Sequence, residues 1–217
     1  MKRDDFLPPN PEAMEAFLAC CHRKKYPNKT AIIRPGDKAT TLYYIVEGSL
    51  SVSTEDEEGH ELILGYLNKG DFLGEMGLFM RPERREVLVR TRMPTEMAEI
   101  TYDRLWALFE TTLEPYKADI LFAIGTQLTA RLLHTSRKVS RLAFMDVTGR
   151  VARTLLDLCQ EPDAMTHPDG IQIRISRQEI SRIVGCSREM AGRVLKELEQ
   201  EGMISVSGKT IVVLDAR

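Results

Sequence analysis

The feature that most constrains this chain is a pair of short amphipathic segments around a glycine, in residues 174–200. Ser176 is followed three residues later by Glu179, which is the spacing of a capping box and predicts that a helix begins there. Gly185 suits a turn, and Ser187 is a good N-cap for a second helix. Residues 174–200 therefore predict two helices joined by a tight turn.

The second of these helices has an apolar face and a polar, mostly basic face when its residues are spaced 3.6 per turn. The apolar positions are Ala191, Val194, Leu195 and Leu198. The opposite face carries Arg188, Glu189, Gly192, Arg193 and Lys196. A short capped helix followed by such a helix suits insertion into the major groove of DNA. The alternative is a solvated amphipathic helix.

The charge of the chain is balanced overall and concentrated locally. A formal net charge of −2 and a pI near 6.1 argue against indiscriminate binding of nucleic acid. Basic residues outnumber acidic ones within residues 174–196, which favours a site-specific binder. With 217 residues and 43% hydrophobic content, the chain is long enough for two modest domains with their own cores.

The sequence does not indicate a membrane-spanning segment, a metal site or disulfide bonds. No apolar run approaches the length of a membrane span, and the first residues lack a hydrophobic signal core, so we expect a soluble, cytoplasmic protein. The four cysteines show no CxxC spacing, which favours reduced thiols. Cys20, Cys21 and His22 are consecutive and would make poor tetrahedral ligands, so we expect no metal.

Residues 26–102 contain short β-rich runs separated by glycine-containing turns, which predict a compact antiparallel β-roll. Residues 35–37 and 69–71 read Pro-Gly-Asp and Lys-Gly-Asp and predict two copies of one turn. The acidic residues 55–58 lie between two strands and predict a solvated hairpin tip. Residues 12–21 predict a short helix before the roll.

Residues 117–143 predict one long helix that follows the roll. Positions at alternating steps of four and three along it are Leu121, Gly125, Leu128, Leu132, Thr135, Val139 and Leu142. Such a heptad seam is expected when two parallel copies of a helix pair. A dimer is also favoured because one pair of reading helices covers too few base pairs to be selective. The alternative is a helix that packs only on its own roll.

The remaining residues complete a small α+β domain. Asp146 is expected to cap a helix that begins at residue 147, residues 171–175 predict a strand, and residues 202–214 predict a hairpin wing. The predicted fold class is therefore α+β, with an N-terminal antiparallel β-roll, a long helix and a C-terminal winged helix-turn-helix. The predicted divisions are the roll with its N-terminal arm (residues 1–116), the dimerisation helix (117–143) and the DNA-binding domain (144–217).

Residues 177–196, RQEISRIVGCSREMAGRVLK, closely resemble the helix-turn-helix of the CRP/FNR family of bacterial transcription regulators, and the resemblance extends over nearly the whole chain. It implies that the base-reading residues are Arg188, Glu189 and Arg193. Their chemistry fits, because arginine can bind guanine O6 and N7 together and a glutamate can accept from cytosine N4. The residues better placed for phosphates are Arg177, Gln178, Ser187, Lys196 and, on the wing, Lys209.

Residues 74–91, GEMGLFMRPERREVLVRT, resemble the phosphate-binding cassette of cyclic-nucleotide domains. Backbone amides around Gly74 and Gly77 could hold a phosphate at a helix start. The resemblance implies that Glu75 holds a ribose hydroxyl and Arg85 the cyclic phosphate. The pair on the long helix that reaches adenine is matched by Thr135 and, from across a dimer, Ser136. The full set of expected ligand-binding residues is Gly74, Glu75, Met76, Arg85, Glu86, Thr135 and Ser136.

Glu86 departs from the cyclic-AMP pattern, in which a serine follows the arginine. A carboxylate repels a phosphate and cannot donate the hydrogen bond of the serine, although it suits the N1–H and N2–H₂ edge of guanine. The segment RREVLVRT also resembles the Clp-type branch of the family, which is associated with cyclic di-GMP and can bind DNA without a nucleotide. The effector is therefore open between cyclic di-GMP and cyclic AMP. A further alternative is that Glu86 only pairs with Arg84 or Arg85 in an empty pocket.

The resemblance also implies a contact with RNA polymerase through the segment before residues 171–175. The matching positions are Thr166, His167 and Gly170, in what the sequence predicts to be a loop. The alternative for this segment is an ordinary exposed connection.

We therefore expect a homodimeric, sequence-specific DNA-binding transcription regulator whose DNA affinity is controlled by a cyclic nucleotide. It would bind DNA without ligand and respond to cyclic di-GMP, or be activated by cyclic AMP. A cupin-type enzyme is a rival, but its metal needs several ligands and His60 is the single histidine within the predicted roll, so no catalysis is expected. A nucleotide-sensing module that acts on a protein partner would not need Arg188, Glu189 and Arg193 on one face.

Overall fold

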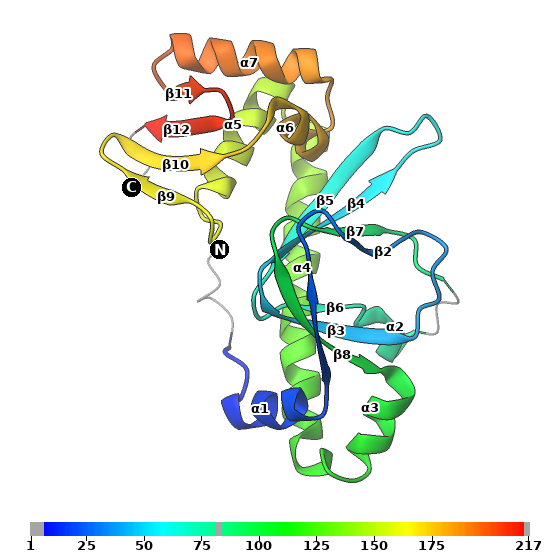
Figure 1. The fold of residues 1–217 in the computed structure, drawn as a ribbon. Coiled ribbons are helices and arrows are strands. Elements are labelled where there is room, and N and C mark those ends of the chain that lie inside the picture. Colours follow the sequence, from blue (N-terminus) through cyan, green and yellow to red (C-terminus); the bar gives the residue numbers. More distant parts are fainter. Residues whose placement is uncertain (1–6, 81–83, 215–217) are drawn as a thin grey trace. The chain divides into compact units, whose positions relative to one another are not determined.

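The computed structural model describes residues 7–80 and 84–214 and has the expected α+β fold (Figure 1). These residues form two compact units. The first unit comprises the described residues up to Thr54 together with Gly65–Thr135, and the second comprises Glu55–Leu64 together with the described residues from Ser136 onward.

The β-roll contains two four-stranded antiparallel sheets. The first sheet has the order β1-β8-β3-β6, and the second has the order β2-β7-β4-β5. The strands are β1 (His22–Tyr26), β2 (Ala31–Ile33), β3 (Thr41–Glu47), β4 (Ser49–Glu55), β5 (Glu61–Asn68), β6 (Phe72–Leu73), β7 (Leu88–Thr91) and β8 (Thr95–Thr101). One core cluster combines Ile45 and Met97 of the first sheet with Leu50 and Val89 of the second. The prediction of an antiparallel roll is thus confirmed.

Two strands of the roll were not expected from the sequence. β1 has the sequence HRKKY, and four of its five residues are exposed, so it shows no apolar alternation. It pairs with β8 along its whole length and therefore owes its conformation to that neighbour. β6 has only two residues, which is too short for a periodic signal.

The two predicted turns of the roll have the same geometry. In each turn an aspartate, Asp37 or Asp71, accepts a hydrogen bond from the backbone amide three residues earlier, at 2.7 Å in both cases. The glycine before the aspartate, Gly36 or Gly70, has a φ of +88° in both turns. Glycine reaches this left-handed conformation without the steric cost of a Cβ atom, which explains the repeated Gly-Asp pair.

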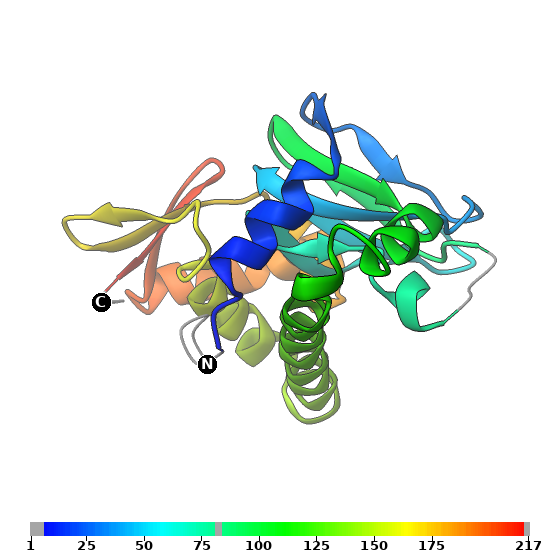
Figure 2. The ribbon, with the colours of Figure 1, turned by 90° about the horizontal axis from the view of Figure 1, so that it is seen from below.

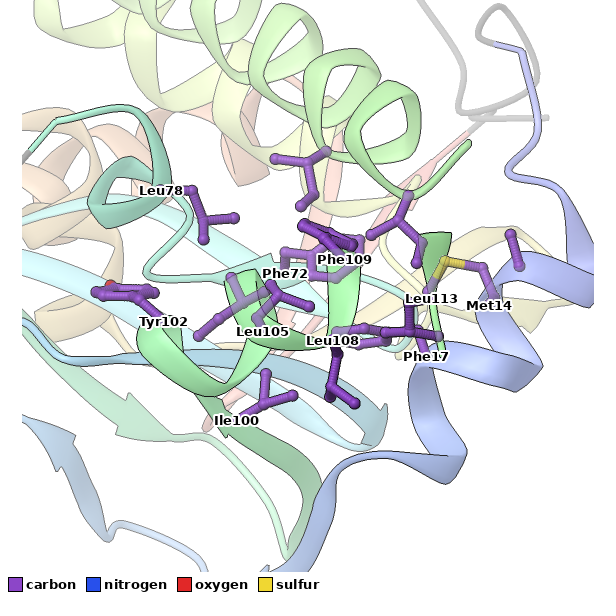
Figure 3. Close-up of a cluster of buried hydrophobic side chains, with 14 residues drawn as sticks. Met14, Phe17, Phe72, Leu78, Ile100, Tyr102, Leu105, Leu108, Phe109 and Leu113 are labelled. Carbon is purple, nitrogen blue, oxygen red and sulfur yellow. The ribbon is translucent and has the colours of Figure 1, made fainter. Parts of the chain in front are cut away.

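The helices of the first unit close one end of the roll. They are α1 (Pro11–Ala19), α2 (Met76–Phe79), α3 (Tyr102–Phe109), the 3-10 turn η2 (Glu114–Tyr116) and the first part of α4 (Lys117–Phe144). Figure 2 shows α4 almost end-on, with α1 and α3 near its first turns. Phe17, Phe109, Ile120 and Ile124 are fully buried in one cluster that these helices share with β3, β6 and β8 (Figure 3).

Helix α4 presents much of the predicted seam to solvent. Leu132, Val139 and Leu142 are 67%, 59% and 41% exposed. Leu121 and Leu128 are instead partly buried against the cluster shown in Figure 3. The seam therefore begins on the core of the first unit and continues as an exposed apolar stripe.

The second unit contains the two predicted reading helices and a small antiparallel sheet. Its elements are α5 (Val147–Leu158), β9 (Met165–His167), β10 (Gly170–Arg174), α6 (Arg177–Val184), α7 (Arg188–Gln200), β11 (Ile204–Ser207) and β12 (Thr210–Leu214). The sheet order is β11-β12-β10-β9, and β11 and β12 form the expected wing. Asp146, Ser176 and Ser187 each cap a helix with the side chain, as predicted.

Two local predictions in the second unit were wrong. Residues 165–167 are strand β9 and not a loop, because the edge of β10 supplies their hydrogen-bonding partners. The helical pattern after Ser176 predicts burial of Ile180, Ile183 and Val184. Ile180 and Val184 of α6 are indeed buried, but the third buried position is Ser181, and Ile183 is only partly buried. Burial of Ser181 is tolerated because its hydroxyl donates to the carbonyl of Gln178 at 2.8 Å.

No helix in residues 7–80 and 84–214 is long and apolar enough to cross a membrane. The four cysteines are unpaired thiols. Burial, together with the neighbouring Cys20 thiol, raises the pKa of the Cys21 thiol to about 12, which disfavours its thiolate form. Within the described ranges, no three His, Cys, Asp or Glu residues are grouped to hold a metal ion.

Candidate DNA-reading surface and ligand pocket

The reading helix α7 separates its apolar and polar residues completely. Its buried residues are Ala191, Val194, Leu195 and Leu198, which are the four predicted from helical spacing. The side chains expected to contact DNA are all exposed: Arg177, Gln178, Ser187, Arg188, Glu189, Arg193, Lys196 and Lys209. The second unit thus presents a polar, mostly basic helix face that is held by an apolar back.

Helix α6 is arranged so that its first residue reaches α7. The Cδ atom of Arg177 lies 3.5 Å from the position that a Cβ atom would take on Gly192. The arginine stem therefore lies across the backbone of α7, beside the polar face. Gly185 ends α6 with a φ of +67°, a left-handed conformation that glycine favours at helix ends.

Arg150 fixes the turn between the reading helices and was not singled out from the sequence. Its Nε donates to the Val184 carbonyl at 3.1 Å, and its Nη1 donates to the Met145 carbonyl at 2.9 Å. These acceptors lie at the end of α6 and just beyond the end of α4. No pattern in the sequence signals this role, because both acceptors are backbone carbonyls.

The hairpin residues Glu55–Leu64 contact other parts of the second unit. Arg182 on α6 forms an ion pair with Glu61 at 3.0 Å, and the Glu61 side chain is only 11% exposed. Lys138 on α4 donates to the carbonyl of Ile63. Burial lowers the pKa of Lys138 to about 8. The tip itself, with Asp56 and its acidic neighbours, is exposed as expected.

The predicted cassette brings Gly74, Glu75 and Arg85 together in the first unit. Glu75 is 5% exposed, and its carboxylate forms an ion pair with Arg131 on α4. Arg131 also donates to the Phe72 carbonyl. Gly74 has a φ of +86°, and a Cβ atom there would lie 3.0 Å from both Nη atoms of Arg85, so the guanidinium lies directly against this glycine.

Arg85 is held by groups of the first unit other than carboxylates. Its Nη2 donates to the Thr41 carbonyl at 2.7 Å and to the Tyr102 hydroxyl at 3.0 Å. The Tyr102 hydroxyl in turn donates to the Gly74 carbonyl at 2.6 Å. Burial raises the pKa of the Tyr102 hydroxyl, and this effect outweighs the opposing effect of the Arg85 charge. The hydroxyl therefore stays protonated and can donate.

The other expected ligand residues lie at exposed positions. Met76 is 54% exposed, and Glu86, Thr135 and Ser136 are also exposed. Arg84 donates to the carbonyl of Gly36 at 2.8 Å. Among the described residues, no ion pair joins Glu86 to Arg84 or to Arg85, so the structure does not have the pairing considered as an alternative.

Three residues that contact Arg85 or Glu75 were missed: Thr41, Tyr102 and Arg131. Arg131 could have been found, because it precedes Thr135 by four residues and so lies on the same face of α4. Gln127, one further turn back, accepts from the Phe72 amide at 2.7 Å and donates to the Phe72 carbonyl at 2.9 Å. Thr41 gave no signal, because it contributes a backbone carbonyl.

The segment expected to contact RNA polymerase is partly ordered by pairing. Thr166 is exposed, His167 is half-buried, and Gly170 is buried where it pairs with His167 and with Leu214. The Nδ1 atom of His167 accepts from the Asp169 amide at 3.3 Å. Of the three residues expected to contact RNA polymerase, only Thr166 is thus exposed to solvent, and the turn at residues 168–169 is exposed beside it.

Comparison with known proteins gives the same division of roles. Residues 23–112 match the cyclic nucleotide-binding domain, and residues 149–217 match the Crp-like helix-turn-helix domain. The chain is 56% identical to the CRP-like protein Clp of Xanthomonas euvesicatoria over 204 residues, which are 94% of this chain and 89% of that protein. The chain belongs to the CRP/FNR family of transcription regulators. This family comprises regulators and not enzymes, as the sequence predicted.

Solved structures of family members share this fold. A structure of the c-di-GMP responsive global regulator CLP from Xanthomonas campestris matches with a TM-score of 0.91 and 55% identity, covering 95% of this chain and all of that chain. That regulator links cell–cell signalling to virulence gene expression. A CRP/FNR family regulator from Thermus thermophilus matches with a TM-score of 0.76 and 24% identity, covering 89% and 94% of the two chains.

Proposed function

We propose that this CRP/FNR family member acts as a homodimer that binds a near-palindromic DNA operator, with its DNA affinity controlled by cyclic di-GMP. The observation that carries the DNA part is the exposed polar face of α7 with its fully buried apolar back. In this proposal Arg188, Glu189 and Arg193 read bases, and the other exposed residues of the set contact phosphates.

The homodimer is supported by the exposed apolar stripe of α4. Three seam positions, Leu132, Val139 and Leu142, are at least 41% exposed in the single chain. Pairing two parallel copies of α4 would bury them and place two α7 helices on successive half-sites. In this arrangement residues 1–116, 117–143 and 144–217 are the ligand-binding, dimerising and DNA-binding parts.

Cyclic di-GMP is proposed as the effector because of Glu86 and because of the similarity to the c-di-GMP responsive CLP. Glu86 is exposed directly after the pocket arginine, where a carboxylate can accept hydrogen bonds from a guanine edge. We propose that the unliganded dimer binds its operator and that cyclic di-GMP reduces this binding. Such an effect requires that the ligand bind the two conformations of the dimer unequally.

Activation by cyclic AMP is the second candidate. It is favoured by the clustering of Gly74, Glu75 and Arg85 in a matched cyclic nucleotide-binding domain. Glu75 would exchange its ion pair with Arg131 for a ribose hydroxyl, and Thr135 and Ser136 would reach the base. A contact of Thr166, His167 and Gly170 with RNA polymerase is proposed for either effector.

The effector is tested by a DNA shift assay with no nucleotide, with cyclic AMP and with cyclic di-GMP. We expect wild type to bind its operator without nucleotide and to be released by cyclic di-GMP. Glu86→Ser should weaken cyclic di-GMP by about 1–3 kcal/mol, because a charge-assisted pair is lost, and should tighten cyclic AMP. Glu58→Ser, at the exposed hairpin tip, is the matched control. Strict dependence of wild type on cyclic AMP would overturn the cyclic di-GMP proposal.

A further inference from the structure

The hydrogen bonds of Arg85 restrict how this residue can bind a phosphate. An arginine can present two pairs of parallel N–H bonds to an anion, one from Nε and Nη2 and one from Nη1 and Nη2. Both pairs include Nη2. In this structure Nη2 already has two acceptors for its two hydrogens, the Thr41 carbonyl at 2.7 Å and the Tyr102 hydroxyl at 3.0 Å. Arg85 can therefore form two parallel hydrogen bonds to a phosphate only if one of these two hydrogen bonds of Nη2 is broken.

The Thr41 carbonyl is the less replaceable of the two acceptors. Thr41 is the first residue of β3 and pairs with Thr101 of β8, so its backbone is fixed in the sheet. Tyr102 contributes a side-chain hydroxyl, and a small shift of the Arg85 guanidinium ends the contact while the hydroxyl still donates to the Gly74 carbonyl. The exchange with an incoming phosphate is therefore expected at Tyr102.

Tyr102 is held firmly in the pocket by other contacts. Its side chain is 9% exposed and lies beside Leu78 at the end of the core cluster opposite Met14 and Phe17 (Figure 3). A Cβ atom on Gly77 would lie 2.3 Å from the Tyr102 ring, so the cassette backbone packs directly on the ring. The hydroxyl also donates to the Gly74 carbonyl at 2.6 Å. Tyr102 thus connects Arg85 with the backbone of the cassette.

We propose that the Tyr102 hydroxyl takes the place of an anionic oxygen on Nη2 of Arg85 in the unliganded pocket, and that the phosphodiester of a cyclic nucleotide must displace it. Tyr102 is then a positioning residue that lowers the affinity of the pocket for its ligand. This inference rests on the proposed function, because it assigns a role to Arg85 in binding a cyclic nucleotide. The Gly74 carbonyl keeps its hydrogen bond from Tyr102 after the exchange, so only one contact has to be given up.

The variant that tests this proposal is Tyr102→Phe, which keeps the ring against Gly77 and removes only the hydroxyl. Isothermal titration calorimetry with cyclic di-GMP and with cyclic AMP gives the affinities. We expect whichever nucleotide wild type binds to be bound about threefold to tenfold more tightly by the variant, because the phosphate no longer competes with a hydrogen bond. Tyr116→Phe removes a hydroxyl from η2 and is expected to keep the wild-type affinity. An unchanged or weaker affinity of Tyr102→Phe overturns the proposal.

A measurement without ligand separates this proposal from the proposed function. In wild type, NMR spectra of the guanidinium groups are expected to show slow rotation and resolved Nη–H signals for Arg85, because both hydrogens of Nη2 are bonded. In Tyr102→Phe these signals are expected to broaden, whereas Tyr116→Phe keeps them. Fast rotation of Arg85 in wild type overturns the proposal. If neither nucleotide binds wild type, the proposed effector is wrong, and the role of Tyr102 is judged on these signals alone.

Discussion

Arg188 and Lys196 lie on the same exposed face of α7, but their chemistry predicts different tasks. Arg188→Ala is expected to cost about 1–3 kcal/mol at the operator and to relax selectivity at one base pair. Lys196→Ala is expected to weaken all DNA similarly and to lower the slope of log affinity against log salt by about one unit. Fluorescence anisotropy with operator and random DNA at several salt concentrations measures both. Equal losses on the two DNAs for Arg188→Ala would contradict its assignment as a base reader.

At the scale of residues, side chains that bond backbone groups close by in the sequence were predictable, and side chains that bond distant backbone groups were not. Ser176 and Ser187 are caps at the predicted positions, because a cap needs only a local amide three residues ahead. Tyr102 and Arg150 bond carbonyls that are distant in sequence, and nothing near them in the chain marks those acceptors. The exposure of Glu86 likewise depends on the folded cassette.

At the scale of elements, the hairpin Glu55–Leu64 is expected to be held to α6 by the Glu61–Arg182 pair. A double-mutant cycle with Glu61→Gln and Arg182→Gln, followed by denaturant unfolding, measures the coupling energy. We expect about 1 kcal/mol or more, because Glu61 is only 11% exposed. The pair Lys69–Glu47 has the same N–O distance of 3.0 Å, but both side chains are 69% exposed, so it should give only about 0.3 kcal/mol. Equal coupling energies would show that burial of Glu61 is unimportant.

The same hairpin gives a dependence of stability on pH through Lys138. Burial lowers the pKa of Lys138 from 10.5 to about 8. Between these two values the unfolded chain holds a proton that the folded chain has released, so the free energy of unfolding rises with pH. The free energy of unfolding of wild type, measured relative to that of Lys138→Met, is expected to rise from about pH 8 to about pH 10.5. Below pH 8 this difference is expected to be at its lowest value. Denaturant unfolding of both proteins across this range is the measurement, and parallel pH profiles would contradict the prediction.

Elements with a strong period of their own were found from the sequence, and elements that depend on a neighbour were not. The long helix was expected over residues 117–143 and spans Lys117–Phe144, because its apolar positions recur over many turns. β9 has three residues and forms only because β10 offers a free edge. β1, with four exposed residues of five, depends on β8 in the same way. Both strands form because a neighbouring strand pairs with them, and the sequence of each strand alone does not indicate that pairing.

At the scale of the whole molecule, the proposed function makes selectivity for DNA depend on pairing two chains. In that proposal a single α7 covers one half-site, and two-fold pairing through α4 would supply the second. The structure also decides which seam residue is the cleaner test. Leu128 is partly buried against the core of the first unit, so a charge there would disturb the chain itself. Leu132 is 67% exposed, and its replacement changes mainly what a second copy would meet.

Leu132→Glu is therefore expected to give a folded monomer. Two facing carboxylates in a paired seam would be buried without partners, which costs several kcal/mol and is enough to separate a modest interface. Light scattering at micromolar concentration measures the mass, and circular dichroism checks the fold. Leu156→Glu replaces a leucine of α5 that is 42% exposed and lies outside the seam, so it should remain a dimer. The monomer should lose most of its affinity for a palindromic operator while its affinity for a single half-site changes little, because each α7 is intact. A Leu132→Glu variant that is still a dimer with full operator affinity would place the dimer contact elsewhere than on α4.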